Sequence, residues 1–326
     1  MFNPTEIIFA CTTSCNLHCA HCFINREPFS LKAGEAVAFL KSAYESENSQ
    51  IEKVGFSGGE PFLCVDFLCT VIKEAVNMDF MFDRIMTNGD WWKNEDSLRS
   101  TLQKIYDAGY DGKIGLSYDD FHGQSEGRIV TFIKAVWDIF GGDALEIQSV
   151  ISLEGKTKVV KEASLSPAPR KIICLANTLN LSCEENISES GAGLVSLSDD
   201  GHFLPVYIQN ESYESSDERA FKDSEWFMDD FCEGPGQILF VHATGDIAPC
   251  CGFANENKGL FIGKISDSFD EVLEKSKKSK MIKICYEEGL SNQIEVLKKE
   301  GKLPKGKTGD ICTFCDFVCK CETLNK

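Results

Sequence analysis

Basic residues are scarce in this sequence. Its 326 residues include 33 Lys and Arg against 51 Asp and Glu, which gives a formal net charge of −18 at pH 7. Proteins that bind nucleic acid neutralise its phosphates with patches of positive charge, so we expect no DNA or RNA partner. An acidic surface keeps a chain soluble, and it can also attract a cationic peptide or protein.

Long apolar runs are also missing. The longest runs, such as residues 7–10 and 238–241, are far shorter than the ~20 residues that a membrane-spanning helix needs. Residues 1–10 contain neither a basic segment nor a cleavage site, so we expect no secretory peptide. We find no internal repeat. The sequence therefore predicts a cytoplasmic protein without a membrane partner.

Cysteine, by contrast, is abundant, with 16 residues in the chain. In a reducing compartment, closely spaced cysteines usually hold a metal rather than form disulfides. Cys15, Cys19 and Cys22 have the spacing C-x3-C-x2-C. Cys11 lies just before them, and we interpret it as a core cysteine at a strand end. Ligation by thiolates alone suits zinc or an iron–sulfur cluster, and both remain open on this spacing alone.

Short strands and helices alternate along the first half of the chain. Apolar runs predict strands, and apolar residues at helical spacing predict helices. The expected strands are residues 6–10, 51–56, 82–86, 113–117, 144–151 and 171–175, and the expected helices are residues 31–46, 66–75, 98–109, 128–140 and 157–163. Alternation with short connections is typical of parallel βα units, whose active sites lie at the carboxyl ends of the strands. The cysteine loop and the Gly-Gly-Glu, Thr-Asn-Gly and Ser-Tyr-Asp-Asp segments all fall at such ends.

The second half of the chain is less regular. Residues 176–231 contain pieces rich in Asn, Ser and Glu, at residues 182–193 and 211–218, which we interpret as linker and loop. Beyond them the sequence predicts a hairpin and a long helical stretch, followed by a cysteine-rich tail. The hairpin comprises residues 237–241 and 246–249 around Thr244-Gly245, and the helical stretch covers residues 269–299 with a break near Gly289.

Two motifs together resemble the signature of the radical S-adenosylmethionine (radical SAM) enzymes. They are C-x3-C-x2-C, with His21 before the last cysteine, and Gly58-Gly59-Glu60 one strand later. The resemblance implies a [4Fe–4S] cluster on Cys15, Cys19 and Cys22, whose remaining iron chelates SAM and whose electron cleaves it to a 5′-deoxyadenosyl radical. It also implies the fold, an α/β protein with a partial, TIM-like (β/α)6 barrel.

The same resemblance implies which residues bind SAM. Gly58, Gly59 and Glu60 would hydrogen-bond the amino group of its methionine part, because paired glycines let a backbone approach a ligand closely. The other implied contacts are with the ribose or carboxylate, by Asn88, Ser117 and Asp119, and with the adenine, by His21. Each of these side chains could instead be an ordinary loop residue.

The cysteines near the end of the chain resemble the twitch form of the SPASM extension, a small domain with a β-hairpin and a helix. Such extensions of radical SAM enzymes bind a second, auxiliary [4Fe–4S] cluster, and the ligands implied here are Cys232, Cys250, Cys312 and Cys315. Cys319 or Cys321 could supply the fourth ligand instead, and a zinc ribbon is the alternative to a cluster. The implied division is a radical SAM core at residues 1–178, a bridging region at 179–231 and an auxiliary-cluster domain at 232–326.

Cys251 directly follows one of these expected ligands. The chain here resembles the radical SAM epimerases of ribosomally made peptides, which remove a Cα hydrogen and return one from a cysteine to the opposite face. The shared segments are Pro249-Cys250-Cys251, the run from Ser117 to His122, Asn88-Gly89-Asp90-Trp91 and Glu288-Gly289. The resemblance makes Cys251 the catalytic hydrogen donor, although Cys251 could also be a structural or cluster cysteine. His122 could point at the substrate or be a loop histidine bonded to the backbone.

The activity implied by this resemblance is the conversion of L- to D-residues in a ribosomally synthesised precursor peptide. An electron donor such as flavodoxin or ferredoxin would reduce the enzyme. One departure is the segment Gly236-Gln237-Ile238, which has no carboxylate where the epimerases carry an acidic residue. Two alternatives therefore stay open: a maturase that forms a thioether or carbon–carbon crosslink in a peptide, and a metal-binding redox sensor without turnover.

Overall fold

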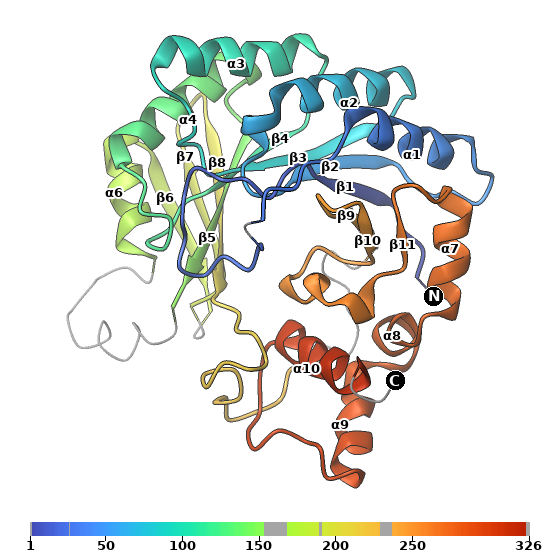
Figure 1. Ribbon diagram of the computed structural model, residues 1–326. Coiled ribbons are helices and arrows are strands. Elements are labelled where there is room, and N and C mark those ends of the chain that lie inside the picture. The colour runs from blue at the N-terminus through green and yellow to red at the C-terminus, as the bar shows by residue number, and fades with distance from the viewer. Residues whose placement is uncertain (1, 26, 153–167, 189–190, 229–236, 324–326) are drawn as a thin grey trace. The chain divides into compact units, whose positions relative to one another are not determined.

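The computed structural model describes the whole chain except residues 1, 26, 153–167, 189–190, 229–236 and 324–326 (Figure 1). The helix expected at residues 157–163 lies outside the described residues. No helix in the described part of the chain has the length and apolar character that crossing a membrane requires.

The chain forms two compact units, which we describe separately. The barrel unit contains residues 11–33 and 54–211, and the terminal unit contains residues 1–10, 34–53 and 212–326.

The barrel unit is built on a mixed sheet. Its strands, in chain order, are β2 (Lys53–Ser57), β3 (Met81–Thr87), β4 (Lys113–Ser117), β5 (Leu145–Ile151), β6 (Ser182–Ile187), β7 (Gly193–Ser198) and β8 (Phe203–Asn210). In space they follow the order β2-β3-β4-β5-β8-β7-β6. The pairs β3–β4, β4–β5 and β5–β8 are parallel, whereas β8–β7 and β7–β6 are antiparallel.

Helices cover the outer face of this curved sheet (Figure 1). They are η1 (Pro61–Cys64), α2 (Val65–Asn77), α3 (Glu95–Asp107), α4 (Glu126–Phe140) and α6 (Arg170–Leu179). Each of the four α-helices buries an apolar stripe against the strands, as α4 does with Ile129, Phe132, Ile133 and Val136. The expected α/β partial barrel is thereby confirmed.

The sixth strand expected at residues 171–175 is wrong, because this segment belongs to α6. Pro169 precedes the first turn of the helix, and Ile172, Leu175 and Ala176 are buried at helical spacing. A short apolar run has the same appearance in a buried strand and in a buried helix, so periodicity alone could not separate the two.

The strand that continues the parallel series is β8, which pairs with β5. The linker and loop expected within residues 176–231 is therefore also wrong in part, since β6, β7 and β8 all lie there. β6 forms the edge of the sheet, and all but its last residue are exposed. Its polar sequence, with two glutamates, suits an exposed edge strand and gives no apolar signal.

The terminal unit joins the start of the chain to its end. β1 (Glu6–Ala10) pairs in parallel with β9 (Ile238–Val241), which forms the expected hairpin with β10 (Asp246–Ala248). Gly245 turns this hairpin with a φ of 84°, a left-handed conformation that favours glycine. The short strand β11 (Gly263–Lys264) pairs with β10.

The helices of the terminal unit are α1 (Ala33–Glu45), η2 (Phe253–Glu256), η3 (Lys258–Leu260), α7 (Phe269–Lys278), α8 (Lys280–Lys283), the π-helix η4 (Ile284–Glu288), α9 (Leu290–Lys299) and α10 (Ile311–Thr323). The expected break near Gly289 is confirmed, and a second break lies at Ser279, whose extended backbone separates α7 from α8. Buried apolar residues of α8, η4, α9 and α10 form one core around the fully buried Phe314.

Candidate active site

The cysteine loop lies in the barrel unit and is held by backbone hydrogen bonds. Cys11 is fully buried and donates its N–H to the carbonyl of Ser57 at 2.9 Å. Burial raises the pKa of its thiol well above the ordinary value, which agrees with a core cysteine outside the ligand triad. Leu31 donates in turn to the carbonyl of Cys11 at 3.0 Å, so both ends of the loop are fixed.

Cys15, Cys19 and Cys22 all line one cavity in the barrel unit. Cys15 and Cys19 are half-buried, and Cys22 is exposed. No further cysteine lines this cavity within the described residues. Three thiols without a fourth fit a [4Fe–4S] cluster that keeps one iron open for another ligand. A structural zinc site needs four protein ligands, and among the residues that line this cavity His21 or His122 would have to supply the fourth.

Gly58 and Gly59 pack directly against the cysteine loop. Gly59 donates its N–H to the carbonyl of Thr12 at 2.6 Å, and Glu60 donates to the carbonyl of Ser14 at 2.9 Å. A Cβ on Gly58 would lie 2.5 Å from the carbonyl oxygen of Thr12, and one on Gly59 would overlap the carbonyl of Ser14. The glycines are therefore required by contact between two protein loops, whereas the sequence suggested only the approach of a ligand.

Glu60 connects the glycine loop to the end of β3. Its carboxylate is completely buried and accepts hydrogen bonds from Phe62 N at 3.1 Å, Thr87 Oγ1 at 2.9 Å and Asn88 N at 2.8 Å. Burial raises the pKa of this carboxyl to about 7, although the hydrogen bonds from Asn88, Phe62 and Thr87 oppose the rise. The side chain thus positions protein groups around the cavity, and a direct contact between Glu60 and SAM stays a prediction.

Asn88 and Ser117 lie at the carboxyl ends of β3 and β4 and both line the cavity. The Asn88 amide donates to Asn16 Oδ1 at 2.9 Å and approaches Cys15 Sγ at 3.6 Å. Gln124, which the sequence did not single out, donates to the backbone carbonyls of Asn88 at 2.6 Å and Ser117 at 2.7 Å. These bonds fix the two strand ends relative to each other.

Asp119 and His122 form a buried acid–imidazole pair. Asp119 Oδ1 lies 2.7 Å from His122 Nδ1 and also accepts the backbone N–H groups of Phe121 and His122. Burial would lower the pKa of His122, but its hydrogen bonds with Asp119 and Cys19 outweigh burial and raise the pKa to about 9. A cationic His122 beside the cysteine loop suits a site that gathers thiolate charge.

His21 completes a group of side chains beside this pair. Its ring centroid lies 5.0 Å from that of His122 and 4.7 Å from that of Phe121. One possible ligand atom each from His21, Asp119 and His122 lie within 4.8 Å of one another. His21 and His122 line the cavity, whereas Asp119 does not line it and contacts the ring of His122. The expected packing of His21 on adenine stays a prediction.

The structure therefore brings most of the expected residues to one cavity. Those that line it are Cys15, Cys19, His21, Cys22, Gly58, Gly59, Asn88, Ser117 and His122. Glu60 and Asp119 do not line it, but they hydrogen-bond Asn88 and His122, respectively. Other residues that line it, and that the sequence did not single out for SAM binding, are Thr13, Leu17, Ile24, Ser57, Met86 and Thr87. Only their position at or beside strand ends could have pointed to them.

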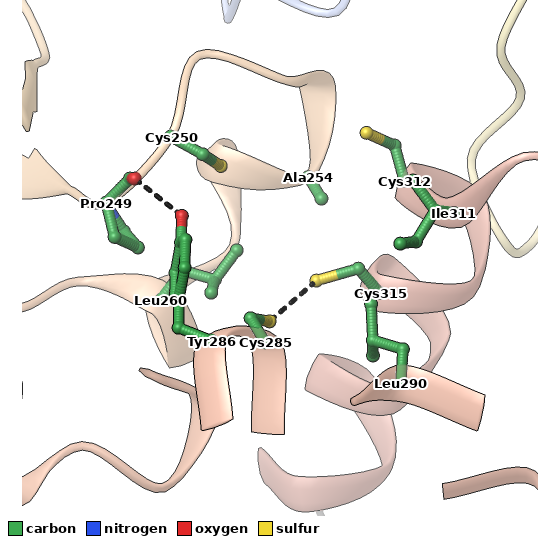
Figure 2. A pocket seen from close by; sticks show the side chains of 10 residues that line it. All are labelled: Pro249, Cys250, Ala254, Leu260, Cys285, Tyr286, Leu290, Ile311, Cys312 and Cys315. Atoms are coloured by element: carbon green, nitrogen blue, oxygen red, sulfur yellow. Dashed lines mark hydrogen bonds between the residues drawn. The ribbon is translucent and has the colours of Figure 1, made fainter. Parts of the chain in front are cut away.

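A second group of cysteines lines a pocket in the terminal unit (Figure 2). Cys250 follows β10, and Cys312 and Cys315 lie on α10, so three of the four expected ligands meet here. The fourth, Cys232, lies outside the described residues. Cys319 and Cys321, the alternatives, do not line this pocket. Cys251, the expected hydrogen donor, is exposed, in contrast to its buried neighbour Cys250.

Cys285 is the pocket residue that sequence reasoning missed. It lies in the π-helix, and its sulfur is 3.8 Å from that of Cys315. From its sequence context alone, Cys285 is predicted to be a core or incidental cysteine. No motif spacing links position 285 to the other cysteines, so no signal in the sequence could have assigned it to the pocket.

Known proteins resemble this chain over both halves. The family described as "4Fe-4S single cluster domain" matches residues 7–129. YydG of Bacillus subtilis (strain 168), named as a peptide biosynthesis protein, is 22% identical over 324 residues, which cover 97% of this chain and 92% of YydG. AlbA of the same organism, an antilisterial bacteriocin subtilosin biosynthesis protein, is 26% identical over 143 residues, or 40% of this chain and 29% of AlbA.

Among solved structures, SuiB of Streptococcus suis matches 96% of this chain and 76% of its own, with 16% identity and a TM-score of 0.47 in its complex with precursor peptide SuiA. SuiB has also been solved with S-adenosylmethionine, and that structure matches with a TM-score of 0.46. In its cysteine loop, in the glycines that pack against that loop and in its sequence relatives, this chain is similar to the radical SAM enzymes.

Proposed function

We propose that this enzyme modifies a ribosomally synthesised precursor peptide and that its reaction is the epimerisation of L- to D-residues. The peptide substrate is supported by the sequence relatives, since YydG is named for peptide biosynthesis and AlbA for the biosynthesis of the bacteriocin subtilosin. Epimerisation is supported by one observation above all, the exposed thiol of Cys251 beside the buried, pocket-lining Cys250.

The barrel cavity would hold the cofactors. Cys15, Cys19 and Cys22 would ligate the [4Fe–4S] cluster, and SAM would contact Gly58, Gly59, Glu60, Asn88, Ser117, Asp119 and His21. When bound, these cofactors supply a 5′-deoxyadenosyl radical, which is chemistry that no side chain offers. The cavity walls would orient SAM and exclude water, with Gln124 fixing the strand ends that carry Asn88 and Ser117.

Cys251 would complete the reaction. After a hydrogen atom leaves the substrate Cα, the Cys251 S–H bond breaks and its hydrogen atom joins the opposite face of that carbon. The resulting sulfur radical takes up one electron and one proton, which restores the thiol. A donor of the flavodoxin or ferredoxin class would supply this electron as well as the one that starts turnover.

The terminal unit would carry an auxiliary [4Fe–4S] cluster. Cys250, Cys312 and Cys315 line one pocket and offer thiolate donors, and Cys232 is the remaining ligand that the motif resemblance implies. Functionally we divide the chain into a radical SAM core at residues 1–178, a bridging region at 179–231 and an auxiliary-cluster domain at 232–326.

The test of epimerisation uses the reconstituted enzyme in D2O with a ribosomally synthesised precursor peptide, sought among the reading frames that neighbour its gene. Epimerisation predicts that the product peptide carries deuterium in place of hydrogen at a Cα. The total number of hydrogen and deuterium atoms in the peptide should stay the same. Cys251→Ala should still form 5′-deoxyadenosine but stop turnover, whereas Cys183→Ala, at an exposed cysteine of β6, should behave as the wild type. Undiminished epimerisation by Cys251→Ala would refute the role of this thiol.

The second candidate reaction is a thioether or carbon–carbon crosslink in a peptide. It is favoured by the segment around Gln237, which lacks the carboxylate that the epimerases carry. Product mass separates the two reactions, because a crosslink removes two hydrogens and epimerisation removes none. A redox sensor without turnover would form no 5′-deoxyadenosine, and a zinc protein would lack the ~8 iron atoms that two clusters need.

A further inference from the structure

The pocket in the terminal unit contains four cysteines contributed by three separate elements. Cys250 comes from the end of the hairpin, Cys285 from the π-helix η4, and Cys312 and Cys315 from α10. Figure 2 shows their sulfur atoms arranged around a common space, with the Cys285 and Cys315 sulfurs 3.8 Å apart. A set of four thiols in this arrangement has the composition of a complete metal or cluster site.

The backbone around Cys285 is unusual. Residues 284–288 form a π-helix, a conformation that is rare and often marks functional sites because it shifts a side chain out of the regular helical register. The next residue, Tyr286, donates its hydroxyl to the carbonyl of Pro249 at 2.9 Å. This bond ties the π turn to the residue before Cys250, and so it fixes Cys285 relative to the hairpin cysteine.

Apart from the cysteines, the residues that line the pocket are uncharged and mostly apolar. Its other lining residues are Pro249, Ala254, Leu260, Tyr286, Leu290 and Ile311, and none of them carries a charge. Cys250, Cys285 and Cys315 are buried. Gly252 packs against the fourth cysteine. A Cβ on Gly252 would lie 2.9 Å from Cys312 Sγ, so the glycine leaves room for that sulfur.

We propose that Cys285 is the fourth protein ligand of an iron–sulfur cluster in this pocket, together with Cys250, Cys312 and Cys315. The inference rests on the auxiliary cluster of the proposed function, and it replaces Cys232, the fourth ligand implied by motif resemblance, with Cys285 on the ground of geometry. Four thiolates bind the four irons of a [4Fe–4S] cluster and leave no iron open, so this centre would transfer electrons rather than bind SAM.

The experiment isolates this pocket by removing the other cluster. In the full chain, Cys15, Cys19 and Cys22 are all changed to Ala, and iron and acid-labile sulfide are measured after anaerobic reconstitution. We expect about four irons per chain in this background and at least a roughly twofold loss when Cys285→Ala is added. Cys174→Ala, at a half-buried cysteine of α6 outside the pocket, is the matched control and should lose none.

A second variant guards against a folding defect. Cys285→Ser keeps the size of the side chain, and its oxygen should change the electron paramagnetic resonance spectrum of the reduced cluster while far-ultraviolet circular dichroism stays unchanged. Full iron content and an unaltered spectrum in both Cys285 variants, with loss of iron in Cys232→Ala, would overturn the assignment. Zinc in place of iron and sulfide would overturn it too.

The outcomes separate this inference from the proposed function. If Cys250→Ala loses iron but the Cys285 variants do not, the auxiliary cluster stands and only its fourth ligand is wrong. If the wild-type enzyme crosslinks its peptide instead of epimerising it, the reaction assignment fails while the iron measurements on Cys285 keep their meaning.

Discussion

The buried carboxyl of Glu60 gives the chain a specific dependence on pH. Its pKa is raised by burial from 4.5 to about 7, so near neutral pH the folded state retains a proton that the unfolded state has lost. Because the folded state binds more protons, the free energy of unfolding decreases as pH rises from about 4.5 to about 7 and then levels off. Glu60 therefore stabilises the chain most when it is protonated.

The size of the effect follows from the same two pKa values. The rise from 4.5 to about 7 corresponds to about 3 kcal/mol in total, of which about 2 kcal/mol falls between about pH 5.5 and about pH 8. In Glu60→Gln this dependence disappears. The glutamine carbonyl can still accept from Phe62 N and Thr87 Oγ1, but its NH2 group would face the N–H of Asn88, at a cost of about 1–3 kcal/mol.

The assay is urea unfolding of the iron-free, reduced chain, followed by far-ultraviolet circular dichroism at several pH values. Wild type should exceed Glu60→Gln in stability most at low pH, and this difference should shrink by about 2 kcal/mol between about pH 5.5 and about pH 8. Glu52→Gln, at an exposed position, should follow the wild type throughout. A difference between wild type and Glu60→Gln that stays constant with pH would refute the reasoning, because Glu60 would then ionise as it does in water.

Three other substitutions test the packing around the two sites. Gly59→Ala forces a methyl group against the carbonyl of Ser14, and it should cost about 1–3 kcal/mol and lower SAM binding in equilibrium dialysis. Asp119→Ala leaves three partly buried backbone N–H groups without their acceptor, and it should lower the melting temperature by an amount equivalent to about 2–3 kcal/mol. Gly252→Ala should displace the sulfur of Cys312, and it should reduce the iron content of the chain in which Cys15, Cys19 and Cys22 are changed to Ala.

Gly34→Ala is the control for both glycine substitutions. Nothing lies within 4 Å of the Cβ that it would gain, and the residue is in α1. Because alanine favours the helical state over glycine by about 0.5–1 kcal/mol, this variant should be as stable as the wild type or more so. A loss of iron in Gly34→Ala equal to that in Gly252→Ala would point to a general effect of the added methyl group rather than to the contact with Cys312.

The sequence predicted the strands that carry the barrel site because their signals are local. β4 and its neighbours are short segments that contain several apolar residues and end at turn residues, and the cysteine loop and Gly58-Gly59 have motif spacing that needs no tertiary information. β6 could not be predicted in this way, since an exposed edge strand carries polar residues and is defined by its pairing with β7. The helix α6 was missed because five apolar-rich residues fit either structure.

The supporting contacts of the site were equally beyond the sequence. The hydrogen bond from Thr87 to Glu60 joins residues that follow or end two different strands, β2 and β3, and it forms because these strands are neighbours in the sheet. Cys285 reaches its pocket through a π turn, a conformation without a reliable sequence signature. In both cases the sequence shows which kind of side chain is present, a carboxylate or a thiol, but it does not show which residues contact that side chain in the fold.

The three-element origin of the C-terminal pocket sets an order of events during synthesis of the protein. Cys250, Cys285, Cys312 and Cys315 leave the ribosome one after another, and the set is complete only after residue 315 has been made. Cys15 to Cys22, on a single loop, are available from the beginning. If the proposed auxiliary cluster fills this pocket, its iron can be delivered only after residue 315 has been translated, and until then the thiols of the pocket are open to oxidation.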